Sequence, residues 1–380
     1  LTSVTGTLDD GTGNDTIALT LATTGVDISS ANTTDVDSIA LASGISATMT
    51  IAQHALVTSA AGTNTVTLSN AGTVSGNAAV EGYVLAAAGN SAFTLGATGQ
   101  NITTGSAGTD TIVVGTLTAT GTFTTVSGDT VSLGTGADIS AVNGAGAGVG
   151  SALAADKLTL VSGASVTMTA AQNNSFDSTV TAAGTETITL SDASSASGIA
   201  EVERYVLAAG AQSFTLGASG QNVTLDSTGS SGSVAISTGT LTSVTGTLDD
   251  GTGNDTIALT LATTGVDISG ANTTTEAVTL SDTTLAAATL NTLNDNTTGA
   301  INANTLTTLT GTAADANTTF AAGKDGHITN LGNEAVTLND TSLATATLNT
   351  LNDNTTGAVD ATTVTTLTGS TADVNTAFTA

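Results

Sequence analysis

Two identical turns rich in glycine and aspartate carry the clearest sign of chemistry in this sequence. Residues 11–17 and 251–257 both read G-T-G-N-D-T-I. They match G-x-G-x-D-x-U, part of a nonapeptide whose turns bind calcium in parallel β-helices. Calcium prefers carboxylate and carbonyl oxygens as ligands, and two further aspartates directly precede each turn. The predicted calcium ligands are Asp9, Asp10, Asp15, Asp249, Asp250 and Asp255.

The same turns have a simpler interpretation. The nonapeptide begins with glycine where this chain has Asp10 or Asp250, and no second nonapeptide follows in tandem. Sites of this kind are shared between adjacent coils, so a single copy argues against high affinity. The alternative is an ordinary turn that leads into a strand, because glycine and aspartate are favoured in turns for backbone reasons alone.

Other patterns that would carry catalysis or bind a transition metal are absent from the sequence. His54 and His327 are isolated and there is no cysteine, so no His/Cys cluster occurs. The G-x-S-x-G motif of serine hydrolases is also missing. Polysaccharide lyases with a β-solenoid fold rely on arginine or lysine in a groove, whereas this chain has three scattered bases, Lys157, Arg204 and Lys324. We therefore expect no enzyme activity.

The charge balance limits the partners that the chain can have. It contains 31 acidic residues against three basic ones, a net charge of −28. Nucleic acids and anionic membranes are bound through clustered lysine and arginine, so neither is an expected partner. An acidic surface keeps a long chain soluble but repels itself, and divalent cations would relieve that repulsion. No run of 18 apolar residues occurs, so no transmembrane segment is expected.

The elements that must position these turns are repeated along the chain. Residues 1–34 return as 241–274 with one difference, Ser30 against Gly270, and a separate 58-residue repeat starts at Glu276 and again at Glu334. Between them, motif pairs such as ATMTIAQ and VTMTAAQ lie 119 to 122 residues apart. We divide the chain into two repeat units, 1–120 and 121–240, the start of a third, 241–274, and two strand/helix repeats, 275–380. Such repetition is typical of solenoids and arrays.

The local pattern predicts short β-strands between turns. Threonine alternates with aliphatic residues in TIALTL (16–21), TVTL (65–68), TIVV (111–114), TVSL (130–133) and TITL (187–190). The chain has no proline, which suits interior strands that need every backbone N–H. The strand spacing favours parallel stacking. The predicted fold is mainly all-β, a right-handed parallel β-solenoid of stacked repeats, with a tandem array of β-sandwiches as the alternative.

The last part of the chain, 275–380, predicts short helices as well as strands. Leu285, Ala288, Thr289 and Leu293 recur at helical spacing, and Asp282 or Thr283 is placed to cap that helix. Residues 371–378 show a second helical pattern. A strand and a helix in about 29 residues have the size of one leucine-rich-repeat coil, so we expect an α/β-solenoid-like part. Asparagine and threonine lower helix propensity, so a β-only coil is the alternative.

These repeats resemble a known class of proteins. The segment GNEAVTLNDTSLATATLNTLNDNTTGAVDATTVTTLTGSTADVNTAF is similar to the repeats of giant bacterial cell-surface proteins of cyanobacterial type, described as beta-strand-repeat or haemolysin-type proteins. The segment VERYVLAAGAQSFTLGASGQNVT resembles the companion repeat of RTX-like adhesins. The resemblance covers nearly the whole chain through composition and repetition. It implies secretion, a cell-surface or matrix location and calcium binding, and it carries over no catalytic residue.

Together, repetition and composition predict an extracellular structural role. We expect the chain to stack with itself into a surface filament, an S-layer-like coat or a matrix fibre, stabilised by calcium. One alternative is an RTX-type adhesin stalk that binds a surface or a glycan such as a cell-surface polysaccharide. Another is an ice-binding, threonine-rich solenoid. The threonines of segments such as 118–123 and 179–189 do not recur at one spacing, which predicts a ragged array.

Overall fold

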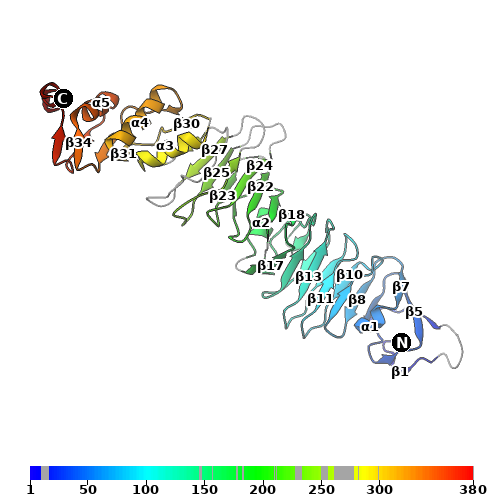
Figure 1. Cartoon of the computed structure of the whole chain (residues 1–380). Helices are drawn as coiled ribbons and strands as arrows, with labels where there is room; N and C mark the ends of the chain where they lie inside the picture. The colour runs from blue at the N-terminus through cyan, green and yellow to red at the C-terminus, as the bar shows by residue number, and fades with distance from the viewer. Residues whose placement is uncertain are drawn as a thin grey trace. The chain divides into compact units, whose positions relative to one another are not determined.

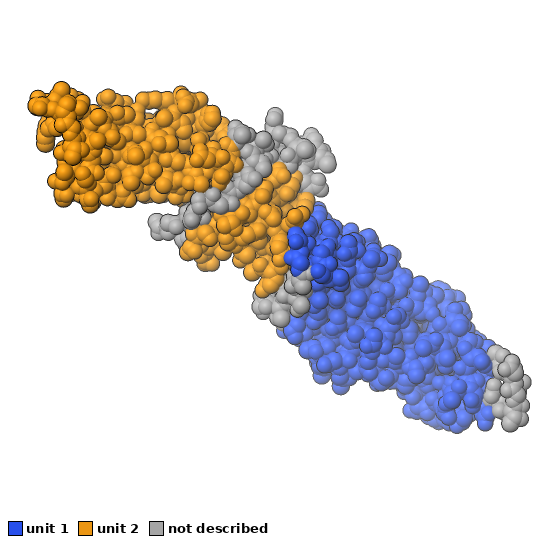
Figure 2. Space-filling view, in the orientation of Figure 1, with its two compact units in different colours: residues 1–191 blue, residues 192–380 orange. Residues whose placement is uncertain are grey.

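The structure is a computed structural model of the 380-residue chain. It describes residues 1–9, 17–144, 148–155, 157–176, 179–181, 184–208, 210, 212–226, 233–249, 256–260, 278–280, 282–297 and 299–379. The chain forms two compact units, Leu1–Ser191 and Asp192–Ala380, which Figure 2 colours separately.

The first unit is built from short strands and two single-turn helices. Its strands are β1 (Gly6–Thr7), β2 (Ile17–Leu21), β3 (Val26–Asp27), β4 (Ala31–Asn32), β5 (Val36–Leu41), β6 (Ser46–Met49), β7 (Val57–Ala60), β8 (Thr65–Leu68), β9 (Thr73–Ser75), β10 (Gly82–Val84), β11 (Ala92–Thr94), β12 (Asn101–Thr103), β13 (Thr111–Gly115), β14 (Thr122–Thr124), β15 (Thr130–Leu133), β16 (Asn143–Gly144), β17 (Lys157–Leu160), β18 (Ser165–Met168), β19 (Thr179–Thr181) and β20 (Thr187–Leu190). Its helices are α1 (Ile51–His54) and α2 (Ala170–Asn173).

Strands that follow one another in the chain belong to different sheets. One sheet has the order β16-β14-β12-β10-β8-β6-β3 and a second has the order β19-β17-β15-β13-β11-β9. The pairs in both sheets are parallel, and Figure 1 shows these strands side by side in ranks. Ser46 pairs with Thr65, Ala92 with Thr111, and Thr111 with Thr130. In these examples, each strand therefore pairs with a strand that lies 19 residues further along the chain.

Alternation along each strand produces the core. In the first sheet, Val66, Tyr83, Ile102 and Phe123 are register partners on neighbouring strands, and all four are buried. In the second sheet, the corresponding column is Phe93, Ile112, Val131 and Leu158. Within each strand, the residues that flank these buried positions point outward. Burial of these columns supplies the main hydrophobic stabilisation, at roughly 25 cal/mol per Å² of apolar surface removed from water.

The second unit combines strands with longer helices. Its strands are β21 (Ala196–Ser197), β22 (Arg204–Ala208), β23 (Gln212–Thr215), β24 (Asn222–Asp226), β25 (Ser233–Ser237), β26 (Leu248–Asp249), β27 (Thr256–Thr260), β28 (Val278–Leu280), β29 (Thr284–Ala286), β30 (Ile301–Asn302), β31 (Thr308–Gly311), β32 (Ile328–Thr329), β33 (Ala335–Leu338), β34 (Ser342–Ala344), β35 (Val359–Asp360) and β36 (Thr366–Thr368). Its helices are α3 (Ala287–Asn296), α4 (Ala313–Lys324), α5 (Thr345–Asn354) and α6 (Thr371–Thr379).

Parallel pairing continues within the second unit. One sheet has the order β21-β23-β25-β27-β28-β30-β32, and β29-β31-β33-β35 form another. Each of the four helices follows a short strand, and α3, α4, α5 and α6 pack on one another in that order. Among the described residues of 275–380, two or three short strands therefore precede each helix, so strands and helices both occur there, as the sequence predicts.

The start of α3 differs from the prediction. Its N-cap is Ala286, which makes no side-chain cap hydrogen bond, so the predicted caps Asp282 and Thr283 are wrong. The reason is that β29 lies between these residues and the helix. The buried face of α3 is Ala287, Leu290 and Leu293, so of the predicted apolar positions inside the helix only Leu293 is buried.

The five strands predicted from alternating threonine are present as β2, β8, β13, β15 and β20. A mainly β fold with parallel sheets is therefore confirmed. An array of β-sandwiches is built from antiparallel sheets, which does not fit the parallel pairs of either unit. Among the described residues, the longest apolar helix is too short to cross a membrane.

Candidate functional site

The carboxylates predicted to bind calcium fall mostly outside the described residues. Asp9 is exposed after β1, and Asp249 is half-buried in β26. The other four lie outside the part of the chain that the structure describes: Asp10, Asp15, Asp250 and Asp255. Within that part, no group of three or more His, Cys, Asp or Glu side chains is placed to hold a metal ion. The calcium site stays a prediction.

Among the described side chains, the candidate functional site is a cluster around His54 in the first unit. Thr50 and Gln53 form a capping box that fixes α1, and His54 is the last residue of this helix. Its side chain turns inward and is 5% exposed. His54 Nε2 lies 2.9 Å from the hydroxyl of Tyr83, a buried residue of β10. The backbone N–H of Asn77 donates to the same hydroxyl at 2.7 Å.

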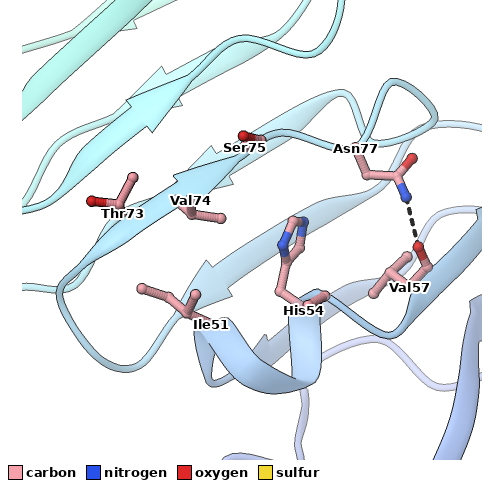
Figure 3. A pocket seen from close by; sticks show the side chains of 8 residues that line it. Ile51, His54, Val57, Thr73, Val74, Ser75 and Asn77 are labelled. Carbon is pink, nitrogen blue, oxygen red and sulfur yellow. Dashed lines mark hydrogen bonds between the residues drawn. The ribbon is translucent and has the colours of Figure 1, made fainter.

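A cavity of about 350 Å³ lies beside this cluster (Figure 3). Its lining residues are Ile51, His54, Ala55, Val57, Thr73, Val74, Ser75 and Asn77. The amide of Asn77 reaches across to donate to the Val57 carbonyl at 2.7 Å, as the dashed line in Figure 3 shows. The walls are mainly apolar, with one imidazole and the hydroxyls of β9 at the exposed side.

Burial sets the protonation states in this cluster. It lowers the pKa of His54 below its usual value, so the imidazole is neutral at physiological pH. It also raises the pKa of Tyr83 to about 12, although the N–H of Asn77 opposes part of that rise. A general base needs a pKa near the working pH and contact with the group it deprotonates. His54 instead makes its hydrogen bond to a protonated phenol, which is a packing contact.

Comparison of the two repeat copies shows which contacts of this cluster recur and which occur only here. The counterparts of His54, Asn77 and Tyr83 in the second copy are Asn173, Ile199 and Tyr205. The Ile199 N–H still donates to the Tyr205 hydroxyl, at 2.8 Å. Both tyrosines also pack against a phenylalanine ring, with centroids 4.6 and 4.8 Å apart. The tyrosine contacts are therefore structural features of the repeat, whereas histidine is not required by it.

Buried glutamines provide a polar contact that recurs throughout the repeats. Gln100 donates from Nε2 to the carbonyls of Asn77 and Val80 at 2.8 and 2.9 Å, and its Oε1 accepts from the Gly96 N–H at 2.8 Å. Gln221 makes the equivalent three bonds to Ile199, Val202 and Gly217 at 2.6, 2.8 and 2.7 Å. Each side chain joins its own turn to the preceding turn of the stack.

Gln53 and Gln172 make the same connection at α1 and α2. Gln53 donates to the carbonyls of Ile28 and Ala31, and Gln172 to those of Ile139 and Val142. In both cases Oε1 accepts the N–H of the helix N-cap. We call these four residues, Gln53, Gln100, Gln172 and Gln221, the glutamine staples. The sequence analysis did not predict them, although the repeated T-M-T-x-A-Q and G-Q-N motifs were the available signal.

Two buried carboxylates act in a similar way. Asp110 accepts the N–H groups of Ser91 and Gly105, both at 2.7 Å. Asp129 accepts the Asp110 N–H at 2.8 Å and the Thr104 hydroxyl at 2.6 Å. Hydrogen bonds to backbone N–H groups compensate the cost of burying these charges. The two carboxylates therefore join neighbouring turns of the chain by hydrogen bonds to their backbone N–H groups.

Several threonines of the first sheet share one register position on neighbouring strands. Thr48, Thr67, Thr103 and Thr124 occupy one row on adjacent strands of the first sheet, interrupted by Val84. The row forms because the turns between strands differ in length while the strand register is kept. The row is broken at Val84 and includes no threonine of 118–123 or 179–189, so the ragged array predicted from those segments stays a prediction.

No family model, curated protein or solved structure matches this chain.

Proposed function

We propose that this chain is an extracellular structural repeat protein. It winds as a right-handed parallel β-solenoid and assembles by stacking into a surface filament, coat or matrix fibre. The observation that carries the proposal is the repeated, in-register parallel pairing of each strand with the next strand of the same sheet. A protein built from equal stacked surfaces gains length from each repeat.

The order of strands supports a solenoid path. β8 belongs to the first sheet, β9 to the second and β10 again to the first. A chain that alternates in this way while every pair stays parallel returns to each face once per coil. The glutamine staples reinforce the stack because each one satisfies carbonyls of the coil before it. The turns are then joined by side-chain hydrogen bonds, in addition to the backbone pairing of the strands.

The composition supports an assembled, extracellular location. A net charge of −28 disfavours dense stacking unless cations are bound, and extracellular calcium is available at millimolar concentration. The resemblance to giant cell-surface repeats points to the same location. Parallel strands at the end of a stack also leave unpaired edges, which are ready templates for another repeat.

The test is direct observation of assembly. We expect the purified full chain to form filaments or sheets in negative-stain electron microscopy, with light scattering that rises on addition of calcium. A monodisperse monomer in both calcium and EDTA would contradict the proposal. If that monomer is retained on polysaccharide beads, the adhesin stalk is the better explanation.

One observation favours a second candidate, ice binding. Thr48, Thr67, Thr103 and Thr124 bring hydroxyl and methyl groups into one register row, which Val84 interrupts. Thermal hysteresis of the full chain tests it, with Thr67→Lys and Thr103→Lys as variants that interrupt the row. Hysteresis that is absent, or unchanged in the variants, removes this candidate.

A further inference from the structure

The cavity beside His54 lies at a break between two sheets of the first unit. β7 is the last strand of the sheet β2-β5-β7, and β9 is the last strand of the sheet that contains β11 to β19. Residues of both strands line the cavity, Val57 from β7 and Thr73–Ser75 from β9 (Figure 3). No pairing of described residues joins the two strands, and the Asn77 side chain crosses the break to the Val57 carbonyl. β9 therefore presents a free edge to the cavity.

The free edge of β9 offers one backbone donor and one backbone acceptor. The Gly76 N–H, which follows β9, donates to the Thr94 carbonyl of β11 at 2.8 Å. Alternate residues of a strand direct their N–H and C=O groups to opposite sides, so Thr73 and Ser75 direct theirs away from β11. Among the described residues, the Thr73 carbonyl and the Ser75 N–H have no hydrogen-bond partner, because β9 pairs with β11 alone. These are the groups that a neighbouring parallel strand would bind.

His54 adds a second donor to the same cavity. The Tyr83 hydroxyl oxygen accepts the Asn77 N–H, so its own proton is left for His54 Nε2, 2.9 Å away. The neutral imidazole then carries its proton on Nδ1, for which the described residues supply no acceptor. The ring lines the cavity and extends from α1 toward β9 in Figure 3. A buried N–H without an acceptor is costly, so an oxygen of a ligand is favoured beside Nδ1.

The walls of the cavity select an uncharged ligand. Ile51, Ala55, Val57 and Val74 are apolar, and the lining contains no acidic or basic side chain apart from the neutral His54. A charged group would lose its hydration there without gaining an opposite charge. At about 350 Å³, the cavity is also at the small end of the range for ligand sites.

We propose that this cavity binds an uncharged amino-acid residue in extended conformation, with an amide on each side and an apolar side chain. The N–H of that residue donates to the Thr73 carbonyl, and its C=O accepts the Ser75 N–H, as in a parallel ladder. Its side chain packs on Val57 and Val74, and His54 Nδ1 donates to the oxygen of its other amide. This chemistry occurs both in small blocked amino acids and within a peptide strand. Binding here is independent of the stacking of repeats.

The second repeat copy shows how the cavity can be filled. The counterparts of His54 and Val57, 119 residues later, are Asn173 and Phe176. Phe176 is larger than valine and is 4% exposed. Val57→Phe should therefore occupy the cavity with a side chain that this repeat already contains at that position.

The test is an NMR titration of the full chain with N-acetyl-leucinamide. The chain has two histidines, so the imidazole signals of His54 are assigned by their loss in His54→Asn. We expect a saturable shift of the His54 signals while those of His327 stay in place. The analogue with an aspartate side chain should cause no such shift, because its carboxylate is charged. A leucinamide titration without a saturable shift at His54 would overturn the inference.

Two variants test the contacts. Ser75→Pro removes the N–H that faces the cavity but leaves the Gly76 bond to β11, and proline is tolerated at such an edge. It should weaken binding by about tenfold or more. Val57→Phe should abolish binding, whereas Val84→Phe, on the outward face of β10, should leave it unchanged. Melting midpoints establish that each variant is folded, and if Ser75→Pro is not, Val57→Phe decides. Unchanged affinity in a folded Ser75→Pro or Val57→Phe chain would overturn the proposal.

A longer probe distinguishes the two sources of the ligand. An acetylated threonine–leucine–threonine amide that binds more tightly than N-acetyl-leucinamide, and loses that gain in Ser75→Pro, assigns the site to a peptide strand. Equal affinities for the two probes assign it to a small amide. If neither probe binds while the chain still forms filaments, the proposed function stands and this site is excluded.

Discussion

Gln100 shows how a single polar side chain holds two turns of the chain together. It is 1% exposed and makes hydrogen bonds to the Asn77 and Val80 carbonyls and to the Gly96 N–H. An apolar residue of similar size would leave the Val80 carbonyl and the Gly96 N–H without this partner, whereas the Asn77 carbonyl would keep its bond from the Val80 N–H at 3.0 Å. Each such group costs about 1–3 kcal/mol, although relaxation and water entry reduce the sum. Glutamine is required here because it alone among uncharged side chains of this length both donates and accepts.

Gln100→Ala should therefore lower the free energy of unfolding by about 2–4 kcal/mol. The measurement is urea unfolding of the full chain followed by circular dichroism. Thr98→Ala is the matched control, since Thr98 is exposed in the same turn and its side chain takes no part in the hydrogen bonds of Gln100. Equal midpoints for the two variants would show that the staple contributes little.

His54 makes the stability of the first unit depend on pH. Burial lowers the pKa of His54 in the folded chain, whereas the unfolded chain titrates near 6.5. At a pH between these two pKa values, the unfolded state therefore binds a proton that the folded state does not. The contribution of His54 to stability is complete above about pH 6.5 and is lost as the pH falls toward its lowered pKa.

The comparison that isolates this contribution is with His54→Asn, which places the residue found at Asn173 in the other copy. We expect the unfolding free energy of the original chain to fall more steeply between about pH 6.5 and 5 than that of the variant. Carboxylates titrate in both chains, so their effect cancels in the difference. Parallel pH profiles would contradict the prediction.

At the scale of elements, the close approach of successive turns restricts residue choice. A Cβ added to Gly96 would lie 1.9 Å from the carbonyl oxygen of Gly76, in the turn below. The same clash recurs between Gly217 and Gly198, at 2.0 Å, so it belongs to the repeat. These glycines are needed for space between backbones, and their position next to a glutamine staple keeps the turns in register.

Gly96→Ala should destabilise the first unit by about 1–3 kcal/mol, because the turn must move away from the one below it. Gly99→Ala, in the same turn, is the control, since a Cβ there meets no atom within 4 Å. It should leave stability unchanged or raise it slightly by restricting the unfolded chain. Thermal melting of both variants measures the difference. Similar losses for the two would show that backbone freedom, rather than close approach, explains the glycines.

At the scale of the whole molecule, acidic charge opposes assembly. With 31 acids against three bases, each added coil brings more negative charge into the stack. Cations bound at the repeated Asp-rich turns would offset that charge locally, whereas cations in the general ionic atmosphere only screen it. Comparison of calcium with magnesium at equal ionic strength separates these effects, because the two ions screen alike but prefer different ligand geometries.

We expect the melting midpoint to rise when calcium replaces EDTA. A site with a hundredfold excess of calcium over its dissociation constant stabilises the folded state by about 2.7 kcal/mol. Magnesium should give a smaller rise, and Asp15→Asn with Asp255→Asn should remove the difference between the ions. A midpoint that is the same in calcium and EDTA would show that these are ordinary turns that lead into strands.

Sequence by itself determined the local elements of this chain. Alternating threonine and aliphatic residues in TVTL and TVSL predicted β8 and β15, because period two places one face of a strand inward wherever that strand lies. The 58-residue repeat likewise predicted strands and helices in 275–380. The cap of α3 was mispredicted because Asp282 has the right residue type at the wrong distance from a helix that starts only after β29.

Tertiary structure decided which residues distant in the chain become neighbours. Gln100 reads as a turn residue in G-Q-N, and only stacking brings the Asn77 and Val80 carbonyls, 23 and 20 residues earlier, within its reach. Periodicity reports the environment that a residue requires on its own element. Burial and hydrogen bonding depend on the neighbouring strands and turns, whose register is set by backbone pairing across the sheets.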